Sequence, residues 1–292
     1  MQYKEGDVVG LFPSMDLSRR GFVMTTLATG FALSVHPAKA QVTTTITTDE
    51  TGLTAGEVKI PVADGEIPAY RAQPAKGKKF PVVIVVEEIF GVHEHIKDLC
   101  RRLAKKGYLA IAPELYSRLG DVPKIEDIKE VIATVNKLHD DQAFSDLDAT
   151  VAWVAKNGGE PGHIGITGFC RGGRMVWMYS AHNPKLKAAV AWYGPLVGKP
   201  SESFPTHPID VVDTLKVPLL GLYGGLDKGI SQDDIAAMKA KIAKDKKVKA
   251  TFIVYPNADH GFNADYRPSY NAEAAADGWK HMLGFFKEHG VG

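Results

Sequence analysis

The stretch Ile164-Gly165-Ile166-Thr167-Gly168-Phe169-Cys170-Arg171-Gly172-Gly173 decides the expected fold of this chain. An apolar segment is followed by glycines on both sides of Cys170, and then by a helical pattern. Glycines two positions before and two after Cys170 let the backbone turn sharply without Cβ clashes. The stretch therefore predicts a strand, a tight turn and the start of a helix, with the Cys170 side chain above the edge of a sheet. A helix N-terminus there favours a thiolate, although the motif alone also fits a buried, inert cysteine.

Strands and helices alternate over the rest of the chain, which predicts an α/β fold. The run 81–86 is almost entirely Val and Ile, as in strands buried on both faces, and Asp64-Gly65 is a hairpin signal. Strands are expected at 58–62, 67–71, 81–86, 108–112, 163–167, 187–193, 218–223 and 250–255, and helices at 95–106, 125–138, 143–156, 171–181, 232–243 and 272–289. We therefore expect one domain in which a mostly parallel sheet carries helices on both faces.

An acidic residue and a histidine follow two later strands. Asp227 comes shortly after the strand that ends at Tyr223, and His260 comes after the next strand. The carboxyl ends of strands in open α/β sheets form the site edge, so we expect both side chains to lie near Cys170. The order nucleophile, acid, histidine is that of the α/β-hydrolase fold, and it predicts a triad in which Asp227 orients the base His260. Asp259 is the alternative acid, although its place directly before His260 suits it better to cap that turn.

The first 40 residues have the pattern of a secretory signal. Arg19 and Arg20 precede an apolar run at 22–35, and Ala38-Lys39-Ala40 follows it. Paired arginines of this kind resemble the twin-arginine export motif, so we expect the twin-arginine export machinery as a partner and a periplasmic or secreted protein. An amphipathic N-terminal helix is the alternative, but a threonine-rich run without caps is a poor helix. The expected division is a signal peptide at 1–40, a flexible arm at 41–56 and an α/β-hydrolase domain at 57–292.

Composition excludes several classes of function. The 292 residues are 45% hydrophobic with a formal net charge of +1, which gives no electrostatic footprint for nucleic acid, and no apolar run is long enough to predict stable membrane insertion. Cys100 lies on the apolar face of a predicted helix and is expected to be a core residue. His93-Glu94-His95 does not predict a metal site, because histidines two apart do not share a helix face. No cofactor-binding fingerprint is present.

At this point the chain resembles the dienelactone hydrolase family, which comprises carboxymethylenebutenolidase-like α/β-hydrolases. The resemblance runs from about Lys59 to the C-terminus. It rests on Glu88-Ile89-Phe90-Gly91, Pro113-Glu114-Leu115-Tyr116, Gly168-Phe169-Cys170-Arg171-Gly172-Gly173, Gly224-Gly225-Leu226-Asp227 and His260-Gly261-Phe262. A cysteine in the turn combined with the Glu-Ile-Phe-Gly motif is more specific than a turn with serine.

The resemblance implies roles for three further residues near the cysteine. The backbone N–H groups of Ile89 and Arg171 would form the oxyanion hole. Glu88 would lie beside the cysteine and accept the thiol proton when substrate arrives, so that the thiolate forms only when it is needed. Glu87 is the alternative by one position, and a carboxylate at a helix N-terminus is the simpler explanation for either.

The resemblance also implies arginines that hold a substrate carboxylate. Arg118 matches one such residue of the family. The second would stand four residues after His260, where this chain has Ala264, and Arg267 is the nearest substitute. Arg171 also departs from the family, where an apolar residue often follows the cysteine.

Together these observations predict a hydrolase that cleaves a lactone or small ester through a cysteine acyl-enzyme. The alternatives are a general short-chain carboxylesterase and a catalytically weak exported binding protein with the same fold. Covalent labelling of Cys170 by a small electrophile separates the binding protein from the enzymes.

Overall fold

The structure is a computed structural model that describes residues 45–292, so the predicted signal peptide and the first residues of the arm lie outside the described part. Its centre is an eight-stranded sheet in the order β1-β2-β4-β3-β5-β6-β7-β8. The strands are β1 (Leu53–Val62), β2 (Gly65–Pro74), β3 (Phe80–Val86), β4 (Leu109–Pro113), β5 (Gly159–Phe169), β6 (Ala188–Trp192), β7 (Leu219–Gly224) and β8 (Ala250–Tyr255). β1 and β2 form an antiparallel hairpin and β2 pairs antiparallel with β4, whereas β3 to β8 pair in parallel. The expected α/β-hydrolase fold is therefore confirmed.

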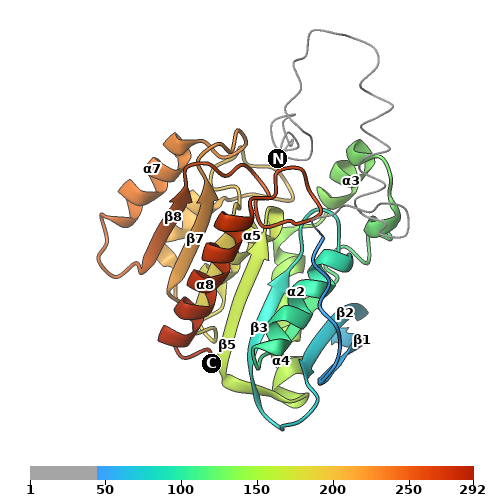
Figure 1. Cartoon of the computed structure of the whole chain (residues 1–292). Helices are drawn as coiled ribbons and strands as arrows, with labels where there is room; N and C mark the ends of the chain where they lie inside the picture. The colour runs from blue at the N-terminus through green and yellow to red at the C-terminus, as the bar shows by residue number, and fades with distance from the viewer. Residues whose placement is uncertain (1–44) are drawn as a thin grey trace.

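Helices cover both faces of the sheet, as Figure 1 shows. They are α2 (Glu94–Lys105), α3 (Ile128–Val135), α4 (Asp140–Lys156), α5 (Arg171–His182), α6 (Pro208–Val211), α7 (Gln232–Ile242) and α8 (Ala272–Glu288), with short 3₁₀ turns η2 (Val122–Lys124) and η3 (Val212–Thr214). α2 and α8 lie on the face nearer the viewer, and α4 and α5 lie on the face behind. The central strands are almost completely buried between these layers, which accounts for their uninterrupted apolar sequence.

One predicted helix is shorter than expected. The helix predicted at 125–138 is α3, which covers only Ile128–Val135. Asp127 caps its N-terminus by accepting a hydrogen bond from the backbone N–H of Lys129, and Pro123 places a 3₁₀ turn in front of it. A capping side chain and a proline thus replace the first turn that periodicity alone predicted.

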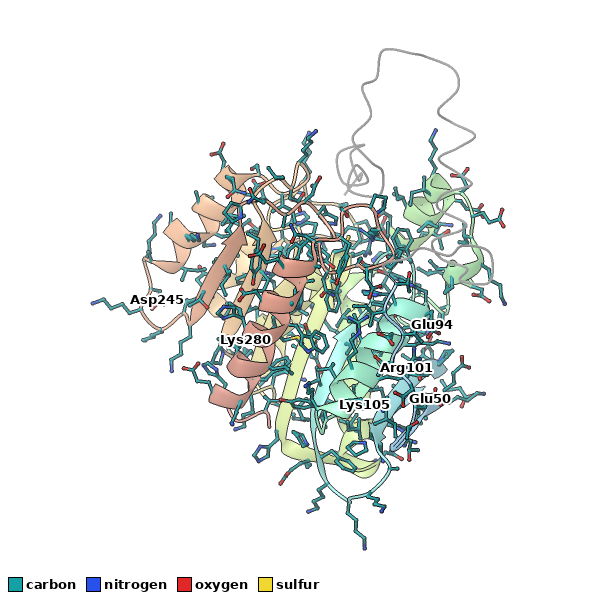
Figure 2. All side chains as sticks on the ribbon, viewed as in Figure 1. Glu50, Glu94, Arg101, Lys105, Asp245 and Lys280 are labelled. Carbon is teal, nitrogen blue, oxygen red and sulfur yellow. The ribbon has the colours of Figure 1, made fainter. Side chains whose placement is uncertain are left out.

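Residues 45–56 of the predicted arm contact α2 in the structure. Its last residues belong to β1, which begins at Leu53. The backbone N–H of Thr48 donates to Asp98 Oδ1 at 2.5 Å, and Arg101 Nε donates to the Thr48 carbonyl at 2.9 Å. Figure 2 shows Glu50 of the arm close to Arg101 and Lys105 of α2. Backbone hydrogen bonds to charged side chains of α2 thus connect this polar segment to the domain.

Candidate active site

Cys170 stands at the turn between β5 and α5 in a strained conformation. Its φ of 54° and ψ of −119° are unusual for a residue with a side chain. The N–H of Cys170 donates to the Trp192 carbonyl at 3.0 Å, which ties the turn to β6. A Cβ on Gly168 would lie 2.5 Å from the Gly172 carbonyl oxygen, and one on Gly172 would lie 2.4 Å from the carbonyl oxygens of Val86 and Glu87 at the end of β3. The flanking glycines are therefore required for close packing.

Asp227 and His260 meet beside this turn. His260 Nδ1 lies 2.8 Å from Asp227 Oδ2, and both side chains are buried. The second oxygen of Asp227 accepts from the backbone N–H groups of Gly229 and Ile230, so the carboxylate is fixed in orientation. Asp259 instead accepts from the backbone N–H of His260 at 2.7 Å, as its position in the sequence suggested. The geometry thus favours Asp227 over Asp259 as the partner of the histidine.

The other ring nitrogen of His260 faces the cysteine side of the site. His260 Nε2 is buried and has no hydrogen-bond partner within residues 45–292. Burial alone would lower the pKa of His260, but the adjacent side chains of Asp227 and Cys170 raise it well above its ordinary value. Cys170 is therefore close enough to the imidazole to act on its ionisation, as a nucleophile beside its base requires.

Glu88 is completely buried and held by three side chains. Arg267 Nη2 lies 3.1 Å from Glu88 Oε1, the Tyr266 hydroxyl donates to Oε2 at 2.6 Å, and His93 Nε2 lies 3.6 Å from Oε2. Burial alone would raise the pKa of Glu88, but the Arg267 guanidinium and His93 hold it well below its usual range. Glu88 is therefore a carboxylate in this structure and a weak base while Arg267 is paired with it.

Arg267 lies close enough to Cys170 for their electrostatic interaction to matter. Its side chain is 3% exposed, and its guanidinium stands over the rings of Phe90 and Tyr266. Its charge acts on Glu88 and on Cys170. Although Ala264 occupies the family's position for a second arginine, Arg267 thus brings a guanidinium to the site from three residues further along.

Glu87, the alternative to Glu88, points elsewhere. Its Oε1 accepts from the backbone N–H of Leu115 at 2.9 Å, on the β4 side of β3. Burial raises the pKa of Glu87 well above its ordinary value, and the nearby carboxyl of Glu114 raises it further. Its hydrogen bond holds the loop after β4, and the structure brings Glu88 rather than Glu87 to Arg267.

Arg118 does not have a guanidinium free to bind substrate. Its nitrogens donate to both oxygens of Asp64 and to both oxygens of Asp146. The side chain of Asp146 is 2% exposed, so Arg118 compensates a buried charge. This arrangement differs from the role that the resemblance implied, because two carboxylates of the protein already occupy the positions that a substrate carboxylate would take.

The residues expected to form the oxyanion hole, Ile89 and Arg171, lie just after β3 and at the start of α5. Ile89 follows Glu88 after β3, and Arg171 is the first residue of α5, where backbone N–H groups have no partner within the helix. The Arg171 side chain turns away from this role: its guanidinium donates to Asn136 Oδ1 at 3.0 Å and stands 4.3 Å from the Phe204 ring centroid. The arginine that departs from the family thus braces neighbouring loops.

Sequence reasoning missed Tyr266 and His93 as contacts of Glu88. Tyr266 is 178 positions from Glu88 in the chain, and no motif linked either Tyr266 or the nearby His93 to Glu88. His93 was considered only as a metal ligand together with His95, and within the described residues no group of three or more potential ligands could hold a metal ion. The structure instead stacks the two histidines, with 6.1 Å between ring centroids, and pairs His95 Nδ1 with Asp265 Oδ1 at 3.1 Å.

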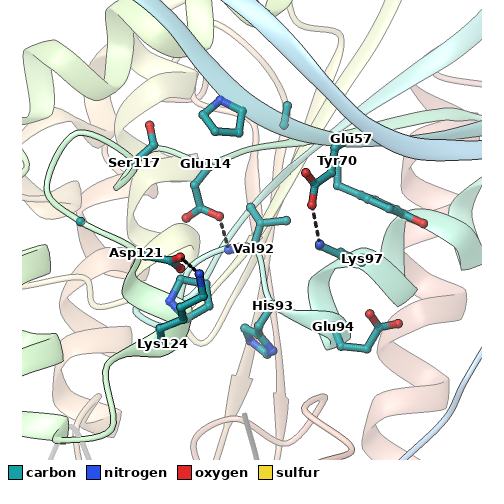
Figure 3. A pocket seen from close by; sticks show the side chains of 14 residues that line it. Glu57, Tyr70, Val92, His93, Glu94, Lys97, Glu114, Ser117, Asp121 and Lys124 are labelled. Carbon is teal, nitrogen blue, oxygen red and sulfur yellow. Dashed lines mark hydrogen bonds and ion pairs between the residues drawn. The ribbon is translucent and has the colours of Figure 1, made fainter. Parts of the chain in front are cut away.

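A cavity of about 680 Å³, with His93 among its lining residues, is shown in Figure 3. It is lined by β1, β2, the start of α2 and the loop after β4, and Glu114 faces it. Cys170, Asp227 and His260 do not line it. We therefore place the candidate active site by the geometry of these three side chains and not by the size of this cavity. Within residues 45–292, no helix is both long and apolar enough to cross a membrane.

Comparison with known proteins identifies the family of this chain. A profile of the dienelactone hydrolase family matches residues 67–290. The chain belongs to the dienelactone hydrolase family. A protein of Methylorubrum extorquens, provisionally named a carboxymethylenebutenolidase, is 55% identical over 98% of both chains. One from Escherichia coli K12 with the same provisional name is 49% identical, over 91% of this chain and 97% of its own.

A solved structure from Klebsiella pneumoniae, provisionally named a dienelactone hydrolase, superposes with a TM-score of 0.79 at 52% identity. The match covers 81% of this chain and 99% of that one. This member of the dienelactone hydrolase family is accordingly a hydrolase of carboxylic esters.

Proposed function

We propose that this hydrolase cleaves a lactone or small ester through a thioester formed on Cys170. The observation that carries the proposal is the 2.8 Å contact between His260 Nδ1 and Asp227 beside a cysteine at a strained turn. A fixed carboxylate that orients a histidine next to a nucleophile is the arrangement that acyl transfer requires.

The chemistry proceeds in two balanced steps. In the first step the Cys170 thiol gives its proton to a base, which we assign to Glu88, and the sulfur forms a bond to the substrate carbonyl carbon. The ester C–O bond breaks, and the leaving oxygen takes a proton from the His260 imidazolium. In the second step His260 removes a proton from water, the water oxygen attacks the thioester, the C–S bond breaks, and the sulfur regains its proton from that base as the acid product leaves. The backbone N–H groups of Ile89 and Arg171 stabilise the negative oxygen formed in each step.

We propose that Glu88 receives the thiol proton when an anionic substrate binds. While Arg267 holds Glu88, the carboxylate is a poor proton acceptor. A substrate carboxylate that pairs with Arg267 would weaken this hold, and burial would then raise the pKa of Glu88. Arg267 thus supports a lactone substrate that carries a carboxylate, because a guanidinium can pair with it through two hydrogen bonds.

A general short-chain carboxylesterase is the second candidate, and the contacts of Arg118 favour it. With Arg118 engaged by Asp64 and Asp146, only one of the two expected arginines remains for a substrate carboxylate. A hydrolysis screen that compares anionic lactones with neutral short-chain esters separates the two candidates. Preference for the anionic lactones supports the lactonase, and equal kcat/KM values support the general esterase.

The triad is tested by matched substitutions. Cys170→Ala and Asp227→Asn are expected to lower kcat by several orders of magnitude with the fold intact. Asp259→Asn is the control, since this carboxylate contacts only its own turn among the hydrogen bonds above. If Asp259→Asn lost activity and Asp227→Asn kept it, the assignment of the acid would be wrong. Failure of a small electrophile to label Cys170 would instead favour the exported binding protein.

We also propose that the protein is exported by the twin-arginine machinery to the periplasm or beyond. The support is the sequence alone: Arg19 and Arg20 before the apolar run, and the small residues up to Ala40. Substitution of both arginines by lysine should leave uncleaved precursor inside the cell. Unchanged fractionation and an N-terminus other than near Gln41 would contradict this.

A further inference from the structure

Tyr193, directly after β6, is buried in the candidate active site without an assigned role. Its side chain has no exposed surface, and its hydroxyl has no hydrogen-bond partner in the part of the chain that the structure describes. A buried hydroxyl without a partner is costly. Such a group in a site is explained if a ligand supplies the missing acceptor.

The backbone directs Tyr193 into this position at a cost. Its φ of 37° makes it, with Cys170, one of two non-glycine residues with positive φ among the described residues. Backbone strain of this kind costs on the order of 1–3 kcal/mol and is typical of functional sites. Gly194 next to it approaches α5 so closely that a Cβ there would lie 2.3 Å from the Gly173 carbonyl carbon. The packing against the nucleophile's helix therefore fixes the strained conformation.

The neighbours of Tyr193 are groups of the candidate active site. Its ring centroid lies 5.2 Å from that of His260, edge to face. Burial raises the pKa of Tyr193 well above its ordinary value, with Glu88 and Cys170 adding to this rise and Arg267 opposing it. The hydroxyl therefore stays protonated and is a donor at neutral pH, within the field of the groups that surround the sulfur.

Glu88, the carboxylate near Tyr193, does not serve as its acceptor. Glu88 Oε2 accepts from the Tyr266 hydroxyl at 2.6 Å. Glu88 Oε1 is ion-paired with Arg267 at 3.1 Å but has no hydrogen-bond partner within residues 45–292, so the Tyr193 hydroxyl does not donate to it. An anionic ligand that takes Arg267 from Glu88 would bring a further acceptor oxygen beside the Tyr193 hydroxyl. We propose that Tyr193 is a specificity-determining residue whose hydroxyl donates a hydrogen bond to the anionic group of a ligand bound at Arg267. This inference rests on the proposed function for the substrate class but not for the binding itself.

The test substitutes Tyr193→Phe, which keeps the ring against His260 and removes only the donor. Expected is a roughly ten- to hundredfold lower kcat/KM for an anionic lactone, mainly through KM, and a change of less than about threefold for p-nitrophenyl acetate. Tyr108→Phe is the matched control, because this buried tyrosine donates to the Val291 carbonyl at the opposite end of the sheet. It should leave both substrates unchanged.

A binding measurement separates this inference from the proposed function. Furan-2-carboxylate carries a carboxylate on a planar ring but no ester, so calorimetric titration reports its binding whether or not the protein hydrolyses lactones. Tyr193→Phe should weaken its binding at least tenfold, and furan-2-carboxamide should bind the wild type and the variant equally. Equal affinity of furan-2-carboxylate for both, or equal loss on both ester classes, would overturn the role of Tyr193. Tyr193-dependent binding without any ester hydrolysis would overturn only the proposed function.

Discussion

The pair formed by Glu88 and Arg267 permits a quantitative test of the site's electrostatics. Both side chains are almost completely buried, and the charged atoms lie 3.1 Å apart. Removal of one member leaves the other as an uncompensated buried charge, which typically costs about 3–5 kcal/mol. We expect Arg267→Met and Glu88→Gln each to lower the free energy of unfolding by this amount. The double variant should lose less than the sum by at least about 2 kcal/mol, because no charge remains unpaired.

The pH dependence provides a second measurement of the same pair. In the wild type the folded-state pKa of Glu88 lies well below the usual range. Its contribution to stability is therefore present above the unfolded-state pKa and is lost only as pH falls through the folded-state pKa. In Arg267→Met, burial should raise that pKa, so the deficit relative to the wild type should shrink as pH falls from 8 to 5. Urea unfolding followed by tryptophan fluorescence measures both effects. Additive single substitutions, together with a deficit that does not change with pH, would refute the reasoning.

Three other perturbations give distinct outcomes. Arg118→Ala should destabilise the fold by about 2 kcal/mol, because its partners are carboxylates of the protein. For the same reason it should change kcat/KM equally for anionic and neutral esters. A loss confined to anionic esters would show that Arg118 binds the substrate carboxylate. Burial raises the pKa of Glu114 to about 7. Its ionisation should therefore lower the free energy of unfolding by about 3 kcal/mol as pH rises from 4.5 to 8. Glu114→Gln should remove this pH dependence of stability, as measured by thermal melts. Gly172→Ala should reduce activity and stability, because the new Cβ would lie 2.4 Å from backbone oxygens. The control Gly284→Ala has no atom within 4 Å of its new Cβ and should stabilise α8 by about 0.5–1 kcal/mol. Similar melting temperatures for the two variants would contradict the packing argument.

The fold, and the meeting of Asp227 with His260 beside the Cys170 turn, could be predicted because they rest on local signals and on the order of the strands. The glycine spacing around Cys170 sets a turn within a few residues, and strand–helix alternation sets which loops share an edge. Asp227 and His260 could then be placed by the order of strands alone, without knowledge of any side-chain contact.

The electrostatic partners were less predictable because they depend on which charges meet after folding. Arg118 follows a strand whose loop opens toward the site edge, yet its guanidinium turns to Asp146 on α4 and to Asp64 in the β1–β2 hairpin. No pattern in the sequence ranks a protein carboxylate above a substrate carboxylate as its partner. The sequence also does not indicate that the Tyr193 hydroxyl is buried without a partner, because an apolar strand followed by a tyrosine is ordinary core sequence.

In the proposed function, Arg267 links binding of an anionic ligand to activation of the Cys170 nucleophile through a single positive charge. Its charge acts on Glu88 and on Cys170, and in this structure Glu88 holds it. A ligand carboxylate competes for the guanidinium, and the more completely it succeeds, the more the buried Glu88 favours its protonated form. In the proposed mechanism Glu88 takes this proton from the Cys170 thiol, so occupancy of Arg267 and formation of the thiolate become one linked equilibrium. A neutral ester does not compete for Arg267 and leaves Glu88 ionised, so discrimination between ester classes should arise in acylation as well as in binding.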